Sequence, residues 1–485
     1  MKENKLISNL AWKFGERISA QLISLIVSII LARLLAPEHY GVISIVMIFI
    51  ALADVLVNDG LGSALIQKKD TTAVDYFSVL YFNLGLSVVL YVILFWLAPF
   101  VTAFYGQDYV ILTPVLRVLG IKVIFSAINS VQQAYVSKQM IFRKNFVATI
   151  SGTIVSAVVG IAMAFLGYGV WALVVQHLLN TFVNTLSLAI VLRKKPQLLF
   201  SFDSLKNLFP YGIRILGSGL LITGYQELRA LIIGKIYSSS DLAFYDKGRQ
   251  FPNLIVTNIN VSIGSVLFPK MSYEQDDKEK IKNTTRNAIR FSSYIMCPLM
   301  LGLAAVSESF VRLILTDKWL PCVPIMQMFC IIYLFQPMHT ANMQAIKAIG
   351  RSDVYLKLEV IKKIIELIFL VLLMKISVEA IVIGMAVCTT LFTFINALPN
   401  SKLINYSFKE QMADLLPSLA MSLCMFALVT LIGRLHLNEW IIFVVQIVVG
   451  FLIYMVLSVI TRNKEFIYFI RMAKRLFNST NGSQV

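Results

Sequence analysis

The chain has 485 residues, of which 58% are hydrophobic and only 14% are charged, and its mean hydropathy is +0.77. In soluble domains roughly a quarter of the residues are charged, so this composition excludes a soluble globular protein. The formal net charge of +17 also excludes a nucleic-acid-binding domain, because the basic residues fall mostly in short segments between apolar runs instead of clustering on a soluble face.

The apolar runs predict an all-α polytopic membrane protein. About 14 of them approach the roughly 20 residues that a helix needs to cross a bilayer. In chain order they cover approximately residues 10–36, 41–66, 77–104, 110–137, 146–167, 169–192, 207–235, 245–269, 287–315, 322–346, 353–375, 378–400, 412–433 and 438–461. Pro298 and Pro337 are expected to break two of these helices. Gly212, Gly217, Gly219 and Gly224 are expected to loosen the seventh helix or, as the alternative, to allow close packing against another helix.

Basic residues mark one side of the membrane. If the N-terminus is cytoplasmic, the inner segments carry groups such as Arg193-Lys194-Lys195, whereas the outer loops carry isolated charges such as Lys235 and Arg434. The positive-inside rule therefore predicts that both termini are cytoplasmic and that the number of spans is even. The five cysteines and four histidines show no ligand spacing, so we expect no metal site, no cofactor and no catalytic residue.

Two arginines lie at similar depth in the first and seventh spans. Arg17 follows Phe14-Gly15-Glu16 and Arg214 follows Tyr211-Gly212-Ile213, so each closes an aromatic-Gly-x-Arg string that opens an apolar run. A charge inside a span is costly and marks a functional site by default. We expect these arginines to line a cavity that attracts anions, with snorkelling to the membrane interface as the alternative.

Other charged residues inside spans extend the candidate site. Arg117 and Lys122 in the fourth span either line the cavity or reach the outer interface, and Arg229 lies toward the outer end of the seventh span. Asp54 and Asp59 in the second span, with Glu227 in the seventh, are candidates to balance a basic residue or to couple transport to a cation. Glu359 with Lys363, and Lys362 with Glu366, are expected to satisfy each other within the eleventh span.

Several strings in the chain resemble those of the polysaccharide flippases (Wzx-type) of the multidrug/oligosaccharidyl-lipid/polysaccharide exporter superfamily. The strings that carry the resemblance are Ala32-Arg33-Leu34-Leu35-Ala36-Pro37-Glu38-His39-Tyr40-Gly41, Asp59-Gly60-Leu61-Gly62-Ser63-Ala64-Leu65-Ile66, Ile233-Gly234-Lys235-Ile236-Tyr237-Ser238, Leu242-Ala243-Phe244-Tyr245-Asp246-Lys247-Gly248 and Gly350-Arg351-Ser352-Asp353. Many relatives have an aspartate where this chain reads Arg229-Ala230, so a charge relay based on that acid is in doubt here.

The resemblance implies an architecture and a function. It implies a six-helix lobe over residues 1–195, a second over 196–400, two further helices over 401–461 and a basic cytoplasmic tail over 462–485. It also implies a multi-pass protein of the bacterial cytoplasmic membrane that exports an undecaprenyl-pyrophosphate-linked oligosaccharide by alternating access. Arg17 and Arg214 suit the pyrophosphate, because arginine stays charged and can bind phosphate oxygens in a bidentate manner.

Three alternatives stay open. A multidrug or cation antiporter of the same superfamily would need an acidic cavity, whereas the charges here lean positive. A flippase for a lipid-linked peptidoglycan precursor would meet the same pyrophosphate chemistry. A membrane-embedded polymerase or glycosyltransferase would need a catalytic acid/base cluster, and the sequence shows none. Coupling to H⁺ or Na⁺ and contact with the polymerase machinery are open.

Overall fold

The computed structural model describes residues 2–58, 60–106, 109–193, 197–435, 438–468 and 471, and these residues form helices with no strand among them. The main helices are α1 (Lys2–Leu34), α2 (Pro37–Asn58), α3 (Leu61–Gln67), α4 (Ala73–Tyr105), α5 (Leu112–Gly120), α6 (Lys122–Gln139), α7 (Phe142–Phe165), α8 (Val170–Leu192), α9 (Phe202–Ile236), α10 (Ser239–Tyr273), α11 (Lys278–Phe310), α12 (Cys322–Leu334), α13 (Gln336–Ala348), α14 (Ser352–Leu373), α15 (Val378–Leu403), α16 (Phe408–Ile432) and α17 (Glu439–Ile460). The predicted all-α membrane fold is confirmed.

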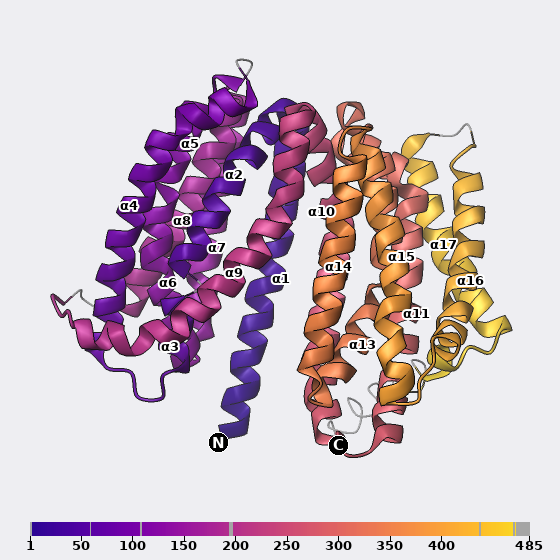
Figure 1. Cartoon of the computed structure of the whole chain (residues 1–485). Helices are drawn as coiled ribbons and strands as arrows, with labels where there is room; N and C mark the ends of the chain where they lie inside the picture. The colour runs from indigo at the N-terminus through magenta and orange to yellow at the C-terminus, as the bar shows by residue number, and fades with distance from the viewer. Residues whose placement is uncertain are drawn as a thin grey trace, which may run out of the picture. The chain divides into compact units, whose positions relative to one another are not determined.

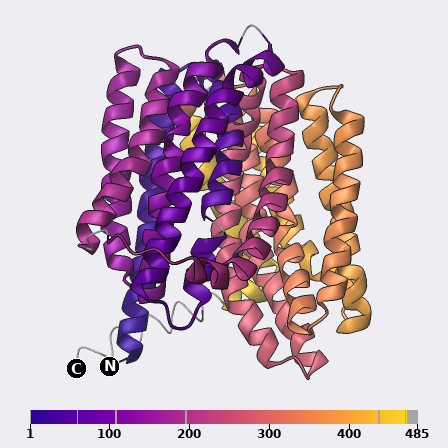
Figure 2. The ribbon, with the colours of Figure 1, turned by 60° about the vertical axis from the view of Figure 1, so that its left-hand side comes forward.

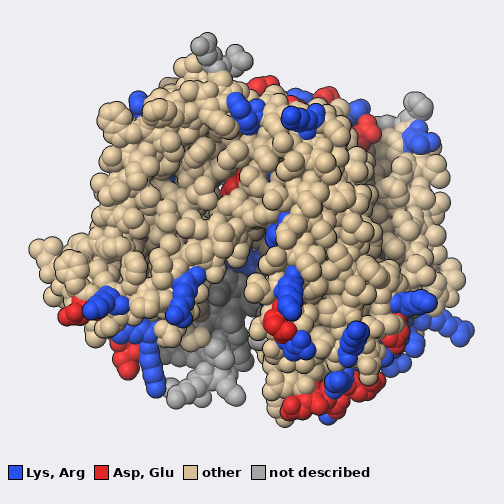
Figure 3. Space-filling model, viewed as in Figure 1, with Lys and Arg blue, Asp and Glu red and all other residues tan. Residues whose placement is uncertain are grey.

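Within the described residues, 11 helical segments are long and apolar enough to cross a membrane. Helices α9, α10 and α14 cover the three remaining predicted spans but are not among these 11 segments. The count of 14 spans therefore stays a prediction. On the face shown in Figure 3, charged side chains gather toward the ends of the helices, and the band between them is mostly uncharged.

The helices group into two units by their contacts, Met1–Ala243 and Phe244–Val485. In the first unit, helices run side by side in both views, and α9 runs obliquely across the others (Figures 1 and 2). The segment 196–243, which the sequence analysis assigns to a second lobe, belongs to this unit because α9 packs on α2, α3 and α4. The division into lobes at residues 195 and 400 stays a prediction.

Local chemistry explains where several helices begin and end. Thr72 and Asp75 form a capping box at the start of α4, and Ser407 and Glu410 form another at the start of α16. Ser201 caps α9 by accepting a hydrogen bond from the Ser204 amide at 3.3 Å. Each side-chain oxygen satisfies a backbone amide that has no partner within its helix.

Prolines act differently in the two helices where breaks were expected. The expected break at Pro298 is wrong, since α11 continues through it. The helices α12 and α13 do separate at Phe335, and Pro337 then occupies the first turn of α13, where its missing amide hydrogen costs no helical bond.

The core of the second unit contains a buried polar network between α13, α15 and α16. Asn342 donates to Gln411 at 2.7 Å and accepts from Asn400 at 2.7 Å, while Asn396 lies 2.8 Å from the Nδ1 atom of His339. Buried polar groups must be paired in a bilayer, so this network fixes how the three helices pack.

The charged pairs of α14 close within the helix, as expected, but with a different spacing. Lys362 bonds to Glu359 at 2.6 Å and Lys363 to Glu366 at 3.2 Å, so the pairs are three residues apart and not four. Residues three or four apart share a helix face, and side-chain rotamers decide which pair forms.

Candidate functional site

Arg17 and Arg214 both lie in the first unit, but on helices that pack against different neighbours. Arg17 is half-buried on α1, which packs on α7, whereas Arg214 is exposed on α9, which packs on α2, α3 and α4. Across the part of the chain that is described, neither guanidinium forms an ion pair or a hydrogen bond with a side chain. Both cations are therefore available to a ligand from outside the protein.

An acid that the sequence analysis left without a role positions Arg17. Glu16 accepts hydrogen bonds from Asn145 at 2.7 Å and from Thr149 at 3.1 Å, both on α7. Asn145 in turn accepts from Gln133 of α6 at 2.6 Å. This chain of neutral donors ties α1 to α7 at the level of Arg17 without using its charge. A carboxylate beside an arginine in an apolar run was the signal in the sequence.

Two glycines hold α9 against the break between α2 and α3. A side-chain carbon at Gly212 would lie 3.2 Å from the carbonyl carbon of Gly60, tighter than ordinary contact. The break itself is stabilised by Asn83 of α4, whose amide donates to the Val57 carbonyl at 3.1 Å. Gly212 therefore allows close packing of α9 at this position. Arg214 lies two residues beyond this contact.

Lys122 and Asp54 form an ion pair between α6 and α2. The Lys122 ammonium lies 3.0 Å from an Asp54 carboxylate oxygen, and only 15% and 21% of the two side chains are exposed. The other carboxylate oxygen of Asp54 is buried and has no hydrogen-bond partner among the described atoms. Lys122 is thus neutralised inside the protein, and Asp54 has the position of a counter-ion.

We expect Asp54→Asn to destabilise the protein by about 2 kcal/mol, because it leaves the Lys122 charge without a partner. Lys122→Met should cost a similar amount, and the double variant should cost less than the sum of the two. Thermal unfolding of the purified protein in detergent, read as a double-mutant cycle, checks this. Additive losses would show that the pair does not couple.

Arg117 serves the backbone of α4. Pro99 has no amide hydrogen, so the carbonyl of Phe95, four residues earlier, loses its helical partner. The Nε atom of Arg117 donates to that carbonyl at 3.3 Å, and its guanidinium lies 4.1 Å from the centre of the Phe95 ring. This contact accounts for Arg117 without either role expected from the sequence, lining a cavity or reaching the outer membrane interface.

Arg117→Leu should therefore destabilise the protein by about 1–2 kcal/mol, the cost of leaving a backbone carbonyl inside the bilayer without a hydrogen-bond partner. In a Pro99→Ala background the same substitution should cost much less, because the amide of residue 99 can then bond to Phe95. Melting temperatures of the four proteins check this. An equal cost in both backgrounds, together with loss of export, would instead assign Arg117 to substrate.

Three candidate residues remain: Arg229, Glu227 and Asp59. Arg229 donates to the hydroxyl of Tyr225 at 3.3 Å and lies 5.4 Å from the centre of that ring, one turn back on α9. Glu227 is half-buried on the same helix. Asp59 lies outside the described residues. In the described ranges, no group of three or more His, Cys, Asp or Glu side chains could hold a metal ion.

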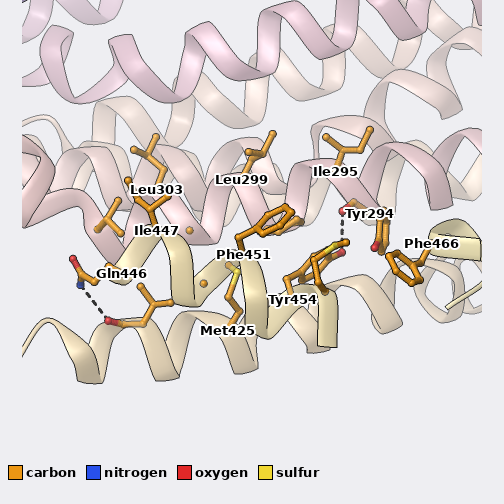
Figure 4. Close-up of a pocket in the computed structure, with 16 residues that line it drawn as sticks. Tyr294, Ile295, Leu299, Leu303, Met425, Gln446, Ile447, Phe451, Tyr454 and Phe466 are labelled. Atoms are coloured by element: carbon orange, nitrogen blue, oxygen red, sulfur yellow. Dashed lines mark hydrogen bonds between the residues drawn. The ribbon is translucent and has the colours of Figure 1, made fainter. Parts of the chain in front are cut away.

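An apolar pocket of about 670 Å³ lies in the second unit between α11, α16 and α17. Figure 4 shows the side chains that line it, which include Tyr294, Leu299, Leu303, Met425, Phe451 and Tyr454. Most of its polar groups bond to neighbours: the Tyr454 hydroxyl donates to the Tyr294 carbonyl at 2.8 Å and the Gln446 amide nitrogen to the Val429 carbonyl at 3.1 Å. The side-chain oxygen of Gln446 has no hydrogen-bond partner among the described atoms. No sequence motif predicts this pocket, because it depends on which helices pack together.

A family model described as "Polysaccharide biosynthesis protein" matches residues 30–324. The lipopolysaccharide biosynthesis protein WzxC of Escherichia coli is 24% identical over 360 residues, which are 74% of this chain and 73% of that protein. The teichuronic acid biosynthesis protein TuaB of Bacillus subtilis is 25% identical over 303 residues, and the alignment covers 62% of each chain.

A solved structure shares the fold. The lipid II flippase MurJ in an inward closed conformation superposes with a TM-score of 0.73 at 16% identity, over 94% of this chain and 99% of that chain. At this identity the likeness concerns the arrangement of helices alone. The family expected from the sequence strings is confirmed by these comparisons.

Proposed function

Because this chain belongs to the polysaccharide biosynthesis protein family, we propose that it exports an undecaprenyl-pyrophosphate-linked oligosaccharide across a bacterial cytoplasmic membrane by alternating access. The chain is a multi-pass membrane transporter and not an enzyme. In the proposed orientation both termini are cytoplasmic, and the lipid-linked unit moves from the inner to the outer face.

The single observation that carries the proposal is the pair of uncompensated arginines, Arg17 and Arg214. Insertion scales put the cost of one charge at the centre of a span at about 2.5–3.5 kcal/mol. The protein neutralises Lys122 with Asp54 and directs Arg117 to a carbonyl, yet among the residues that are described Arg17 and Arg214 have no such partner. An anionic ligand would offset their cost, and a pyrophosphate accepts bidentate hydrogen bonds from guanidinium groups.

The apolar pocket of the second unit, taken by itself, suits a hydrocarbon chain. It is lined mainly by apolar and aromatic side chains, and the Tyr454 hydroxyl is already paired, so most of its surface has the chemistry that an isoprenoid chain requires. Its volume of about 670 Å³ takes only part of a long polyprenyl tail. The rest of the tail then stays in the bilayer.

We expect Gly302→Leu to reduce export severalfold without unfolding the protein. A side-chain carbon at Gly302 would meet Met425 at an ordinary 3.6 Å, so the added leucine has room and occupies space in the pocket. Surface glycan quantified at equal protein levels checks this. Gly217→Leu, where no atom lies within 4 Å of the added carbon, is the control for a new leucine elsewhere. Unchanged export in the Gly302 variant would contradict a role for this pocket.

Deleting the gene tests the proposal as a whole. We expect loss of surface glycan and accumulation of the lipid-linked repeat unit in the inner leaflet, both reversed by the intact gene. An antiporter would instead change resistance to cationic drugs. A peptidoglycan precursor flippase would instead cause accumulation of lipid II and cell lysis.

A further inference from the structure

A second cleft, of about 660 Å³, lies at one end of the first unit. Four segments line it: the start of α2, the α4–α5 connection, the turn between α7 and α8, and the start of α10. They lie at the end of the helices where α1 meets α2 and α9 meets α10, the upper end in Figure 1. The residues proposed above for the pyrophosphate and the tail are not among its lining residues.

Aromatic side chains supply flat apolar faces in this cleft. Tyr168 is 55% exposed at the tip of the α7–α8 turn, and Trp171 and Tyr109 are half-buried beside it. The turn is set by Gly167 and Gly169, whose φ angles of +82° and +54° are left-handed conformations that favour glycine. The turn therefore holds Tyr168 in place at the cleft. The C–H face of a sugar ring is an apolar surface that packs on such rings.

Polar groups also line this cleft. Glu38 accepts a hydrogen bond from the Ser240 hydroxyl at 3.0 Å, and the His39 ring packs on the backbone of Gly169. Ser238 donates to Asp241 at 2.7 Å and so fixes the start of α10. A carboxylate accepts hydrogen bonds from hydroxyl groups, and serine and histidine both donate and accept them.

The charge of the cleft selects among sugars. Glu38 is the one charged side chain among the described residues that line it. Three helices, α2, α8 and α10, begin at the cleft, and their N-terminal dipoles partly offset this charge. A neutral, hydroxyl-rich ring can donate to Glu38, whereas a second carboxylate placed there would be repelled.

We propose that this cleft binds a neutral sugar ring of the glycan at the face where the glycan leaves the protein, an inference that rests on the proposed function. Tyr and Trp are also common as lipid anchors at membrane interfaces. Here they line one cavity together with a carboxylate and serine hydroxyls, which an anchor facing lipid does not require.

The test is sugar binding to the full chain in lipid nanodiscs, which avoids detergents with sugar head groups. The probes are maltotriose, which is neutral, and trigalacturonate, which is acidic, and binding is read by saturation-transfer NMR. We expect maltotriose to bind, trigalacturonate to bind more weakly, and Trp171→Leu and Glu38→Gln each to weaken maltotriose about tenfold. Trp440→Leu is the matched control, since Trp440 is 55% exposed at the start of α17 and outside the cleft.

Three results would overturn the inference: no binding of maltotriose, tighter binding of trigalacturonate, or an equal loss in the Trp440 variant. Melting temperatures of all variants identify any that fail to fold, and Tyr168→Ala at the exposed turn then replaces such a variant. The assay needs no transport. If maltotriose does not bind but the gene deletion still removes surface glycan, the cleft does not bind sugar and the proposed function is unaffected. If the gene deletion changes nothing, the proposed function is wrong.

Discussion

Replacing Arg17 and Arg214 together by alanine is expected to reduce glycan export at least a hundredfold, while leaving the amount of folded protein unchanged. A hydrogen bond to a charged group contributes about 1.5–3 kcal/mol, so losing two guanidinium groups from a pyrophosphate removes about 3–6 kcal/mol of binding. The fold should not suffer, because the protein gives neither guanidinium a side-chain partner within the described residues. Surface glycan per cell, normalised to membrane protein by immunoblot, is the measurement.

Two controls sharpen this result. Arg33→Ala removes an exposed arginine at the end of α1 and should leave export near the wild-type level. Lysine at both positions keeps the charge but loses the bidentate geometry, so that variant should keep part of the activity. Wild-type export in the double alanine variant would remove these arginines from the site.

Alanine at Gly41 is expected to destabilise the protein by at least about 3 kcal/mol. A side-chain carbon there would lie 1.8 Å from the carbonyl oxygen of Ser239, and the neighbouring atoms are also backbone. Backbone cannot rotate away as a flexible side chain can, so the start of α10 would have to separate from the first turn of α2. The measurement is the melting temperature in detergent, together with the yield of monodisperse protein.

Gly85→Ala is the matched control for Gly41→Ala. It also replaces a helical glycine, on α4, but no atom lies within 4 Å of the added carbon. It should be neutral or stabilise the protein by about 0.5–1 kcal/mol, since alanine favours helix. Equal melting temperatures for the two variants would contradict the close contact between α2 and α10.

The sequence predicted the helices well because bilayer thickness sets a length that composition alone reveals. It could not predict partners across helices. Lys122 and Asp54 are 68 positions apart, so only packing brings them together. Arg117 was ambiguous for the same reason, although Pro99, which frees the Phe95 carbonyl, was visible in the neighbouring span.

Glycine in a membrane helix has two interpretations, and only the packed structure decides between them. An isolated helix with glycine is more flexible, which suggested that Gly212 loosens its span. In the folded protein the missing side chain lets α9 approach Gly60 instead. Cavities were invisible at the sequence level, since the apolar pocket combines residues from α11, α16 and α17 that share no motif.

Reconstitution of the purified protein tests whether fixed positive charge in the membrane carries a phosphorylated head group across it. Liposomes would contain either the wild type or the Arg17→Ala/Arg214→Ala variant, with a polyprenyl-pyrophosphate-linked oligosaccharide labelled on its sugar and enzymatic access to the outer leaflet as the readout. We predict that the wild type exposes the labelled lipid many times faster than protein-free liposomes, that the variant does not, and that a polyprenyl-linked sugar without phosphate is not moved. Equal rates for wild type and variant, or equal rates with and without the pyrophosphate, would contradict this mechanism.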